Sequence, residues 1–176
     1  YRTYYTNGQL ETVSTMKDGE KTGQFKNYDR EGHLLLEGYF TNGRLTGDNL
    51  GYYTDGTVRH RYNYSNGMKV GTNMQYYPNG KLRIRESVSP NGTDLKEEGF
   101  RADETPLYEK SFRKSRPIGT WKYFFRDGKT DSLRETYQNG KLHGARTLYY
   151  PDGGKKLVEE YQFNLITGTV TNYFEN

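Results

Sequence analysis

An aromatic residue recurs every 24 positions along the chain, and this spacing limits the possible folds more than any other feature. The first column contains Tyr4, Tyr28, Tyr52, Tyr76, Phe100, Phe124, Tyr149 and Tyr173. A second column with the same spacing contains Met16, Phe40, Tyr64, Val88, Phe112, Tyr137 and Tyr161. Both columns shift by one residue between positions 128 and 137, so a single insertion explains both. Self-similarity at a fixed period indicates a repeat protein.

Glycine-containing turns divide each repeat into two strands. Asn-Gly or Asp-Gly pairs recur along the chain, and these pairs favour tight hairpins because a type I′ turn needs positive φ at both central residues. The turn glycines form two series: Gly8, Gly32, Gly56, Gly80, Gly128 and Gly153, and Gly19, Gly43, Gly67 and Gly140. A third series lies four residues after the second turn: Gly23, Gly47, Gly71, Gly119, Gly144 and Gly168. Glycine inside a strand marks a bulge or a close backbone approach, so we expect a bend there.

These patterns predict an all-β fold. We expect an elongated antiparallel β-meander ribbon built from about seven 24-residue hairpin repeats, as a single domain over residues 1–176. One irregular repeat, with longer loops or a kink, is expected at about residues 87–116. There Glu104 and Ser115 replace turn glycines, and Leu95 replaces a glycine of the third series.

Tyrosine takes the place of an aliphatic core in this composition. The chain has 18 Tyr and 8 Phe, and its net charge is only +4, which does not suit a disordered chain. A single-layer sheet has little interior, so side chains with an apolar ring and a polar tip suit its half-buried positions. Stability is then expected to be a sum of repeat terms and interfaces between neighbours.

Two segments carry a family resemblance. Residues 76–82 read YYPNGKL and residues 137–144 read YQNGKLHG. This form resembles the MORN-repeat family, and more closely its bacterial variant. The resemblance covers nearly the whole chain except the irregular stretch. It implies an elongated β-meander that serves as a binding or scaffolding surface, and bacterial relatives are often grouped as YwqK-like antitoxins.

The residues offer little for catalysis. The chain has no Cys, which excludes disulfides, thiolate metal sites and Cys nucleophiles. His33, His60 and His143 are too few and too scattered to suggest a metal cluster, and no nucleophile elbow, phosphate-binding glycine loop or HExxH motif occurs. The turn requirement already accounts for the Asn and Asp residues that could suggest calcium. We therefore expect no enzyme, no cofactor and no metal.

Nucleic acid and anionic lipid are disfavoured as partners. Basic residues interleave with aromatic ones at residues 110–116 and 121–123, which is the type of surface that binds single-stranded nucleic acid. However, Lys and Arg exceed Asp and Glu by only four, and any half-exposed strand alternates in this way. A protein partner is the main expectation, and a glycan is the alternative.

A variable position follows each residue of the first column. It is occupied by Tyr5, Asp29, Tyr53, Tyr77, Arg101, Phe125, Tyr150 and Phe174. Because adjacent strand residues point to opposite faces, one face is predicted to carry the constant ladder and the other the variable one. Exposed aromatic arrays mark recognition surfaces. The candidate binding surface is therefore Tyr5, Tyr53, Tyr77, Phe125, Tyr150 and Phe174, unless both ladders only stabilise cross-strand packing.

The sequence thus predicts a non-enzymatic repeat module for protein binding or scaffolding. Its alternatives are a glycan-binding envelope protein and an antitoxin or immunity protein of the YwqK-like group. The chain opens without Met and stops inside a repeat motif, so we expect it to be trimmed or processed. It contains no apolar segment near 18 residues. We expect it to be exported or in the cell envelope, with the cytoplasm as the alternative.

Overall fold

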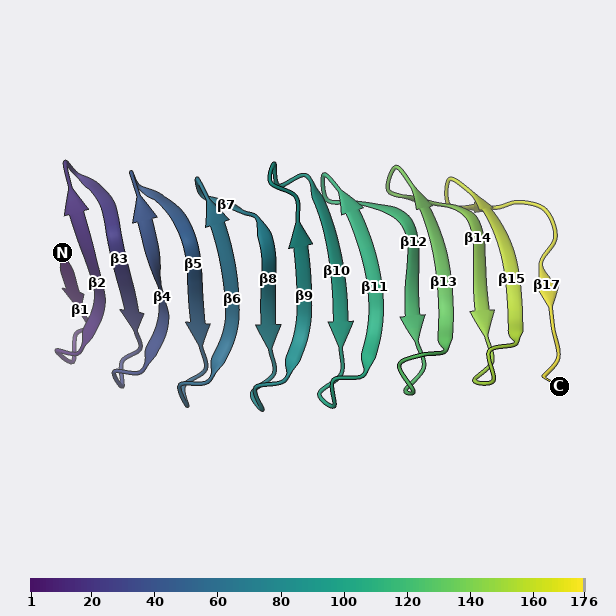
Figure 1. Ribbon diagram of the computed structural model, residues 1–176, viewed down its shortest axis with the longest axis horizontal. Helices are drawn as coiled ribbons and strands as arrows, with labels where there is room; N and C mark the ends of the chain where they lie inside the picture. The colour runs from purple at the N-terminus through teal and green to yellow at the C-terminus, as the bar shows by residue number, and fades with distance from the viewer. Residues whose placement is uncertain (176) are drawn as a thin grey trace. The chain divides into compact units, whose positions relative to one another are not determined.

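The computed structural model describes residues 1–175 as an all-β protein (Figure 1). Within these residues there are seventeen strands and no helix, and the paired strands run antiparallel. The predicted all-β meander of hairpins is confirmed. The chain divides by its contacts into two compact units, Tyr1–Arg83 and Ile84–Asn176, and each is described by itself.

The first unit contains the hairpins at the purple and blue end of Figure 1. Its strands follow one another in chain order, and each pairs with the next. Their bounds are β1 (Arg2–Tyr4), β2 (Leu10–Lys17), β3 (Glu20–Tyr28), β4 (Leu34–Thr41), β5 (Arg44–Tyr52), β6 (Val58–Ser65), β7 (Met68–Lys69) and β8 (Gly71–Tyr76). β6 pairs with both β7 and β8, because these two strands are consecutive in the chain and are separated only by Val70.

The second unit repeats this arrangement, with β9 beginning just before the boundary and pairing with β10 inside the unit. Its strands are β9 (Leu82–Val88), β10 (Asp94–Phe100), β11 (Pro106–Arg113), β12 (Arg116–Phe124), β13 (Asp131–Gln138), β14 (Lys141–Tyr149), β15 (Lys155–Gln162), β16 (Leu165–Ile166) and β17 (Thr171–Asn172). The stretch expected to be irregular keeps its hairpins. It contains a longer loop at residues 89–93, and Glu104 and Ser115 take the positive φ of the missing glycines.

The two turns of each repeat differ in type, which the sequence did not predict. The second turn, such as Asn42-Gly43, has positive φ at both residues (49° and 72°), as a type I′ turn requires. In the first turn only the glycine has positive φ. There the Asn or Asp side chain instead accepts the backbone N–H two residues later, as Asp55 Oδ1 does from Thr57 N at 2.9 Å. The prediction of tight type I′ turns was therefore wrong for the Asn-Gly and Asp-Gly pairs of the first turn.

The third glycine series forms bulges, as predicted. Gly23, Gly47, Gly71, Gly119 and Gly144 have φ between 62° and 94° inside or at the start of strands. In the first hairpin the pairing steps from Ser14 opposite Phe25 to Thr15 opposite Thr22, which leaves two extra residues, Gly23 and Gln24, on β3. A bulge of this kind bends the strand and increases its twist.

The two columns lie on opposite faces of the sheet. In the first unit Phe40 pairs with Leu45 and Tyr64 pairs with Gly47, and directly opposite residues share a face. We call this the Phe40 face. Tyr52 lies on the other face, where its hydroxyl donates to Glu37 Oε1 at 2.6 Å. In the second unit the rings of Phe112, Trp121 and Tyr137 are in contact, and we call their side the Tyr137 face.

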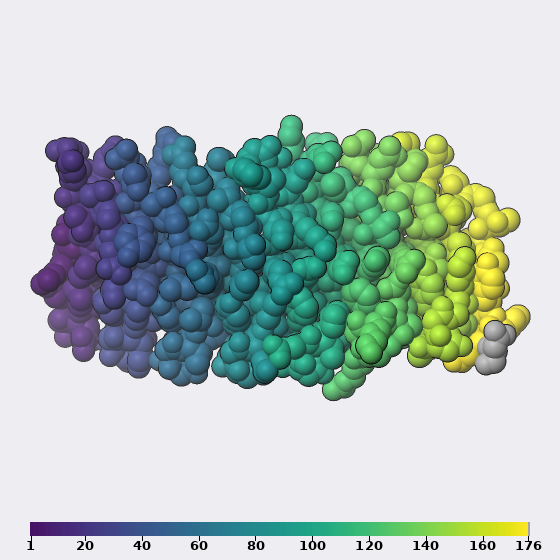
Figure 2. All heavy atoms as spheres, in the orientation of Figure 1, coloured from purple at the N-terminus to yellow at the C-terminus, as the bar shows by residue number. Residues whose placement is uncertain are grey.

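Neighbouring repeats are joined at the type I′ turns by backbone hydrogen bonds. Gly43 N donates to Lys21 O at 2.9 Å, and Gly67 N donates to Leu45 O at 2.9 Å. In the second unit Gly140 N donates to Pro117 O at 2.9 Å. Each turn thus lies against the repeat before it. Within each unit the colours of Figure 2 accordingly run in chain order.

Almost no apolar side chain is fully buried. Phe25, at 6% exposure, is the buried hydrophobic residue among those described, and its ring contacts Phe40 with centroids 4.8 Å apart. Buried polar residues accompany it: Ser14, Asn49, Asn73, Glu86 and Thr147. This matches the expectation that stability comes from repeat interfaces instead of one large core.

Candidate functional site

Three of the predicted surface tyrosines connect neighbouring repeats. The Tyr5 hydroxyl donates to Tyr28 O at 2.8 Å. In the same way, Tyr53 donates to Tyr76 O at 2.7 Å and Tyr150 donates to Tyr173 O at 2.9 Å. Each bond spans 23 residues and ends on the first-column residue of the next repeat. The hydroxyls therefore satisfy backbone carbonyls at the edge of the sheet.

The other residues at this position vary in their contacts. Arg101 substitutes for tyrosine, since its guanidinium donates to Phe124 O at 2.8 Å. Tyr77 and Phe125 are half-buried, and the backbone of each closes its own first turn. Phe174 is 94% exposed. Within each unit the candidate residues lie at separate repeats, and their role as a binding surface stays a prediction.

From strand alternation we expected the variable position to lie on the face opposite the constant ladder. The structure does not place it there. Tyr53 follows the last residue of β5 and begins the turn. The pairing register also shifts between Gly51 and Tyr52, which places an irregularity at the ladder residue. Alternation no longer applies once the strand has ended, so the side chain points along the sheet edge to the next repeat.

A hollow of about 360 Å³ lies on the Phe40 face of the first unit. Phe25, Leu36 and Leu45 supply apolar walls, and the rings of His60 and Tyr62 stack with centroids 4.3 Å apart and planes 17° apart. Its other lining residues are Asn27, Leu35, Asn49, Arg59 and Tyr64. The hollow therefore combines aromatic surface with a few polar groups, as ligand pockets do.

Two glycines shape this hollow because they have no side chain. A Cβ on Gly51 would lie 2.1 Å from the His60 ring, and a Cβ on Gly38 would lie 1.8 Å from Asn49 Oδ1. The imidazole and the amide therefore lie directly on the backbone of the neighbouring strand. Asn49 is only 3% exposed, and its Nδ2 donates to Gly47 O at 3.1 Å. Its side chain is fixed by the bulge that Gly47 makes.

The hollow has a positive electrostatic environment. Burial lowers the pKa of His60, and the charges of Arg59 and Lys69 lower it further. The Lys69 ammonium lies 4.3 Å from the centroid of the Tyr62 ring. Two carboxylates of the neighbouring strands, Glu37 and Asp48, lie on the opposite face, since Glu37 binds Tyr52 and Asp48 pairs directly with Asn63.

The Tyr137 face of the second unit carries aromatic rings around a lysine. The Lys110 ammonium lies 4.3 Å from the Tyr108 centroid and 5.1 Å from the centroids of both Trp121 and Tyr123. Cation–π attraction holds an ammonium at such distances. Burial, and then the Glu135 carboxylate, raises the pKa of the neighbouring Tyr137 hydroxyl. The chain's own lysine therefore occupies this aromatic cluster.

An ion-pair network continues the Tyr137 face. Arg146 lies between two carboxylates, 3.2 Å from Glu135 Oε1 and 2.8 Å from Glu159 Oε2. Leu95 and Phe112 line a second hollow, of about 390 Å³, beside the long loop at residues 89–93. This unit thus presents paired acids and bases, whereas the hollow of the first unit has Arg59 and Lys69 beside its apolar walls.

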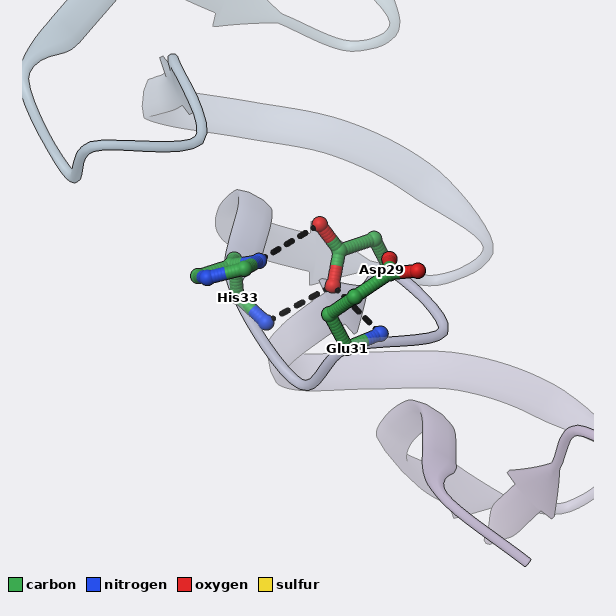
Figure 3. A group of neighbouring side chains, drawn as sticks. All are labelled: Asp29, Glu31 and His33. Atoms are coloured by element: carbon green, nitrogen blue, oxygen red, sulfur yellow. Dashed lines mark hydrogen bonds and ion pairs between the residues drawn. The ribbon is translucent and has the colours of Figure 1, made fainter. Parts of the chain in front are cut away.

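A single turn of the first unit gathers three potential metal ligands (Figure 3). The carboxylates of Asp29 and Glu31 and the imidazole of His33 have ligand atoms within 4.8 Å of one another. Asp29 Oδ1 accepts from His33 N at 2.8 Å, and Asp29 Oδ2 lies 2.9 Å from His33 Nδ1. The scatter of histidines in the sequence did not suggest this grouping. Its internal hydrogen bonds explain the arrangement as a turn, and we assign it no metal.

On the face opposite the hollow, hydrogen bonds from Arg61 and then from Asn63 lower the pKa of Asp48. Sequence reasoning missed the central position of the faces, which lies two residues after each bulge glycine. It is occupied by Phe25, Asn49, Asn73, Glu97, Trp121 and Arg146. The 24-residue spacing of this position was visible in the sequence. The position was missed because the residues that occupy it differ in chemical type.

The fold is a sheet of repeated hairpins, which are joined to one another at the turns on both ends of their strands. These features define a β-hairpin repeat protein. The sequence model of the MORN repeat variant matches residues 1–18, 21–42 and 69–88. These segments are similar to the MORN repeat variant, which confirms the resemblance seen at residues 76–82. No curated protein matches the chain. Among the described residues there is also no helix that is long and apolar enough to cross a membrane.

Proposed function

We propose that the protein is a non-enzymatic repeat module that binds a protein partner through its sheet faces, and that it acts at the cell envelope. One observation carries this proposal. The turn positions that join repeats recur with little change, whereas the central face position changes from Phe25 to Asn49, Trp121 and Arg146. Repeat proteins build extended binding surfaces in this way, because the scaffold contacts are confined to neighbouring repeats.

The test uses the tagged full-length chain as bait in extract from its source cells, followed by mass spectrometry. We expect saturable, stoichiometric capture of a protein whose mass stays unchanged after incubation. A face variant, Tyr62→Ser with Tyr123→Ser, should lose capture. A matched variant, Tyr39→Ser with Tyr4→Ser, changes two exposed tyrosines away from these clusters and should keep it. Circular dichroism must show folded sheet in both. Turnover of the captured molecule, or equal capture by both variants, would contradict the proposal.

A glycan is the second candidate ligand, favoured by one group of side chains. Trp121 contacts Phe112 and Tyr137 with ring centroids 5.1 and 4.6 Å apart, and Glu135 and Arg146 lie beside them. Aromatic rings can pack against sugar faces while charged groups bind hydroxyls. Enrichment of polysaccharide instead of protein by the same bait would favour this alternative.

A further inference from the structure

A strongly basic turn lies at one edge of the second unit, between β11 and β12. Residues 113–116 of this turn read RKSR, and all four are exposed. The next type I′ turn along the edge lies against it, since a Cβ on Gly140 would be 3.3 Å from the Arg116 Cβ, and Lys141 follows that glycine. We call these cations the basic edge: Arg113, Lys114, Arg116 and Lys141.

Only one cation of the basic edge has an acidic partner. The Asp94 carboxylate accepts from the Arg113 guanidinium, from Nε at 2.9 Å and from Nη2 at 3.2 Å. Among the described residues no carboxylate forms an ion pair with Lys114, Arg116 or Lys141. The second unit as a whole has no such excess, since it contains 15 Lys and Arg and 14 Asp and Glu. The positive charge is therefore local to this edge.

The turn at residues 113–116 is unfavourable for the fold in two ways. Arg113 lies directly opposite Arg116 in the pairing register, and like charges in this relation destabilise a sheet. Lys114 and Ser115 both have positive φ, a conformation that costs free energy for residues with a Cβ. Proteins break such local rules mainly at functional sites. The two costs together indicate that these cations serve a purpose other than stability.

The same turn leaves a backbone donor unused. In other type I′ turns the glycine N–H donates to the repeat before it, as Gly43 N does to Lys21 O at 2.9 Å. Here Lys114 N makes this bond, to Thr93 O at 2.7 Å, and Ser115 N donates to no described residue. A backbone N–H beside cations is a favourable contact for a carboxylate, because charge-assisted hydrogen bonds are short and strong.

We propose that the basic edge binds an acidic segment of a partner protein, whose carboxylates lie against Lys114, Arg116 and Lys141. The proposal rests on the protein-binding function proposed above and adds a contact at the sheet edge. A short acidic segment fits the local charge of two adjacent turns. A membrane or a nucleic acid would also meet the acidic residues of an almost neutral unit, which disfavours both.

The test titrates the 15N-labelled full chain with blocked peptides and follows backbone amide shifts by NMR. The probe is Ac-GEEDEEG-NH2, and Ac-GQQNQQG-NH2 is a neutral control of the same length. We expect saturable shifts at Ser115, Arg116 and Lys141 with the acidic probe. The neutral peptide should bind about tenfold more weakly, and added salt should weaken the acidic probe because it screens exposed charges.

A pair of variants with equal net charge tests the position of the site. Lys114→Gln with Arg116→Gln should weaken the acidic probe about tenfold, because two of the three unpaired cations are lost. Lys17→Gln with Lys155→Gln removes two exposed charges outside the basic edge and should change the affinity by less than about twofold. Dispersed spectra must show that both variants are folded.

A third variant should move stability and binding in opposite directions. Lys114→Asn with Ser115→Gly relieves the strain of the turn and removes one cation. We expect it to unfold at a higher temperature than the unaltered chain while binding the acidic probe about threefold more weakly. A folding defect cannot produce this combination, and unchanged affinity would count against the site.

The proposal is overturned if acidic and neutral peptides bind equally, or if the shifts map away from the basic edge. Binding of oligothymidylate or of phosphatidylserine vesicles there, without any response to the peptide, would assign the edge to nucleic acid or to a membrane. If a partner is captured in extract equally well by the Lys114→Gln, Arg116→Gln variant, the binding function stands and this site is wrong. If the edge binds the probe but no protein is captured, the site stands and the function proposed above fails.

Discussion

At the scale of single residues, tyrosine serves two structural purposes in this chain. First-column residues such as Tyr52 pack on the sheet and donate to a carboxylate, and burial followed by Glu37 raises the pKa of Tyr52 to about 12. The residue after the column reaches across to the next repeat, as Tyr53 does to Tyr76 O. The hydroxyl therefore matters as much as the ring, because it satisfies a carbonyl at the sheet edge.

Removing one such hydroxyl should destabilise the protein measurably. Tyr53→Phe leaves the Tyr76 carbonyl without its donor, and we expect the free energy of unfolding to fall by about 0.5–1.5 kcal/mol. Urea denaturation followed by circular dichroism measures this change. Tyr39→Phe is the matched control, because Tyr39 is 49% exposed and no described residue hydrogen-bonds its hydroxyl. Equal effects of the two substitutions would show that the bond between repeats contributes nothing.

At the scale of the hairpin, each repeat uses one type I′ turn and one wider turn closed by an Asn or Asp side chain. The type I′ turn of the irregular repeat has Lys114 at φ 48° and Ser115 at φ 60°, where the turns at residues 18–19, 42–43, 66–67 and 139–140 have Asn or Asp followed by Gly. Left-handed conformations of this kind are unfavourable for residues with a Cβ. The turn persists because Lys114 N donates to Thr93 O at 2.7 Å. This hairpin thus holds backbone strain that its sequence could relieve.

Restoring the common dipeptide should stabilise the protein. Lys114→Asn combined with Ser115→Gly removes the strain while keeping the backbone hydrogen bond, so we expect a gain of about 1 kcal/mol in unfolding free energy. The reverse exchange, Asn42→Lys with Gly43→Ser, should lower stability by a similar amount, since a Cβ on Gly43 meets only ordinary contacts. Thermal and urea unfolding of both variants measure the difference. A loss of stability in the first variant would disprove the strain argument.

At the scale of the whole molecule, the contacts of each repeat lie with its sequence neighbours inside its unit. Hydrogen bonds between repeats span 22 or 23 residues at both sheet edges, as from Gly43 to Lys21 and from Tyr53 to Tyr76. The expected elongated ribbon stays a prediction from the 24-residue register, and so does the single domain. Such a chain would gain stability repeat by repeat.

Small-angle scattering of the monomer tests the ribbon directly. A compact globule of this length would have a radius of gyration of roughly 16 Å. The unbroken register predicts a value well above that, together with a pair-distance distribution that has a long tail. Light scattering on the same sample controls for oligomers. A compact monomer would rule out the single ribbon.

The sequence by itself determined the repeat, its two strands and its bulges. These features depend on local backbone requirements, and Gly or Asn at a fixed spacing reports them directly. Local signals also placed Gly47 and Gly71 in bulges before any contact was known. The resemblance at residues 76–82 then indicated the MORN repeat variant.

Only the tertiary structure decided what the side chains do. Tyr5 and Tyr53 bind carbonyls 23 residues away, which strand alternation cannot reveal because the strand ends before them. His60 and Asn49 gather at one hollow because Gly51 and Gly38 let them lie on the neighbouring strand. Such groupings depend on pairing register, and a one-residue shift such as that between Gly51 and Tyr52 changes the phase that a period of two would predict.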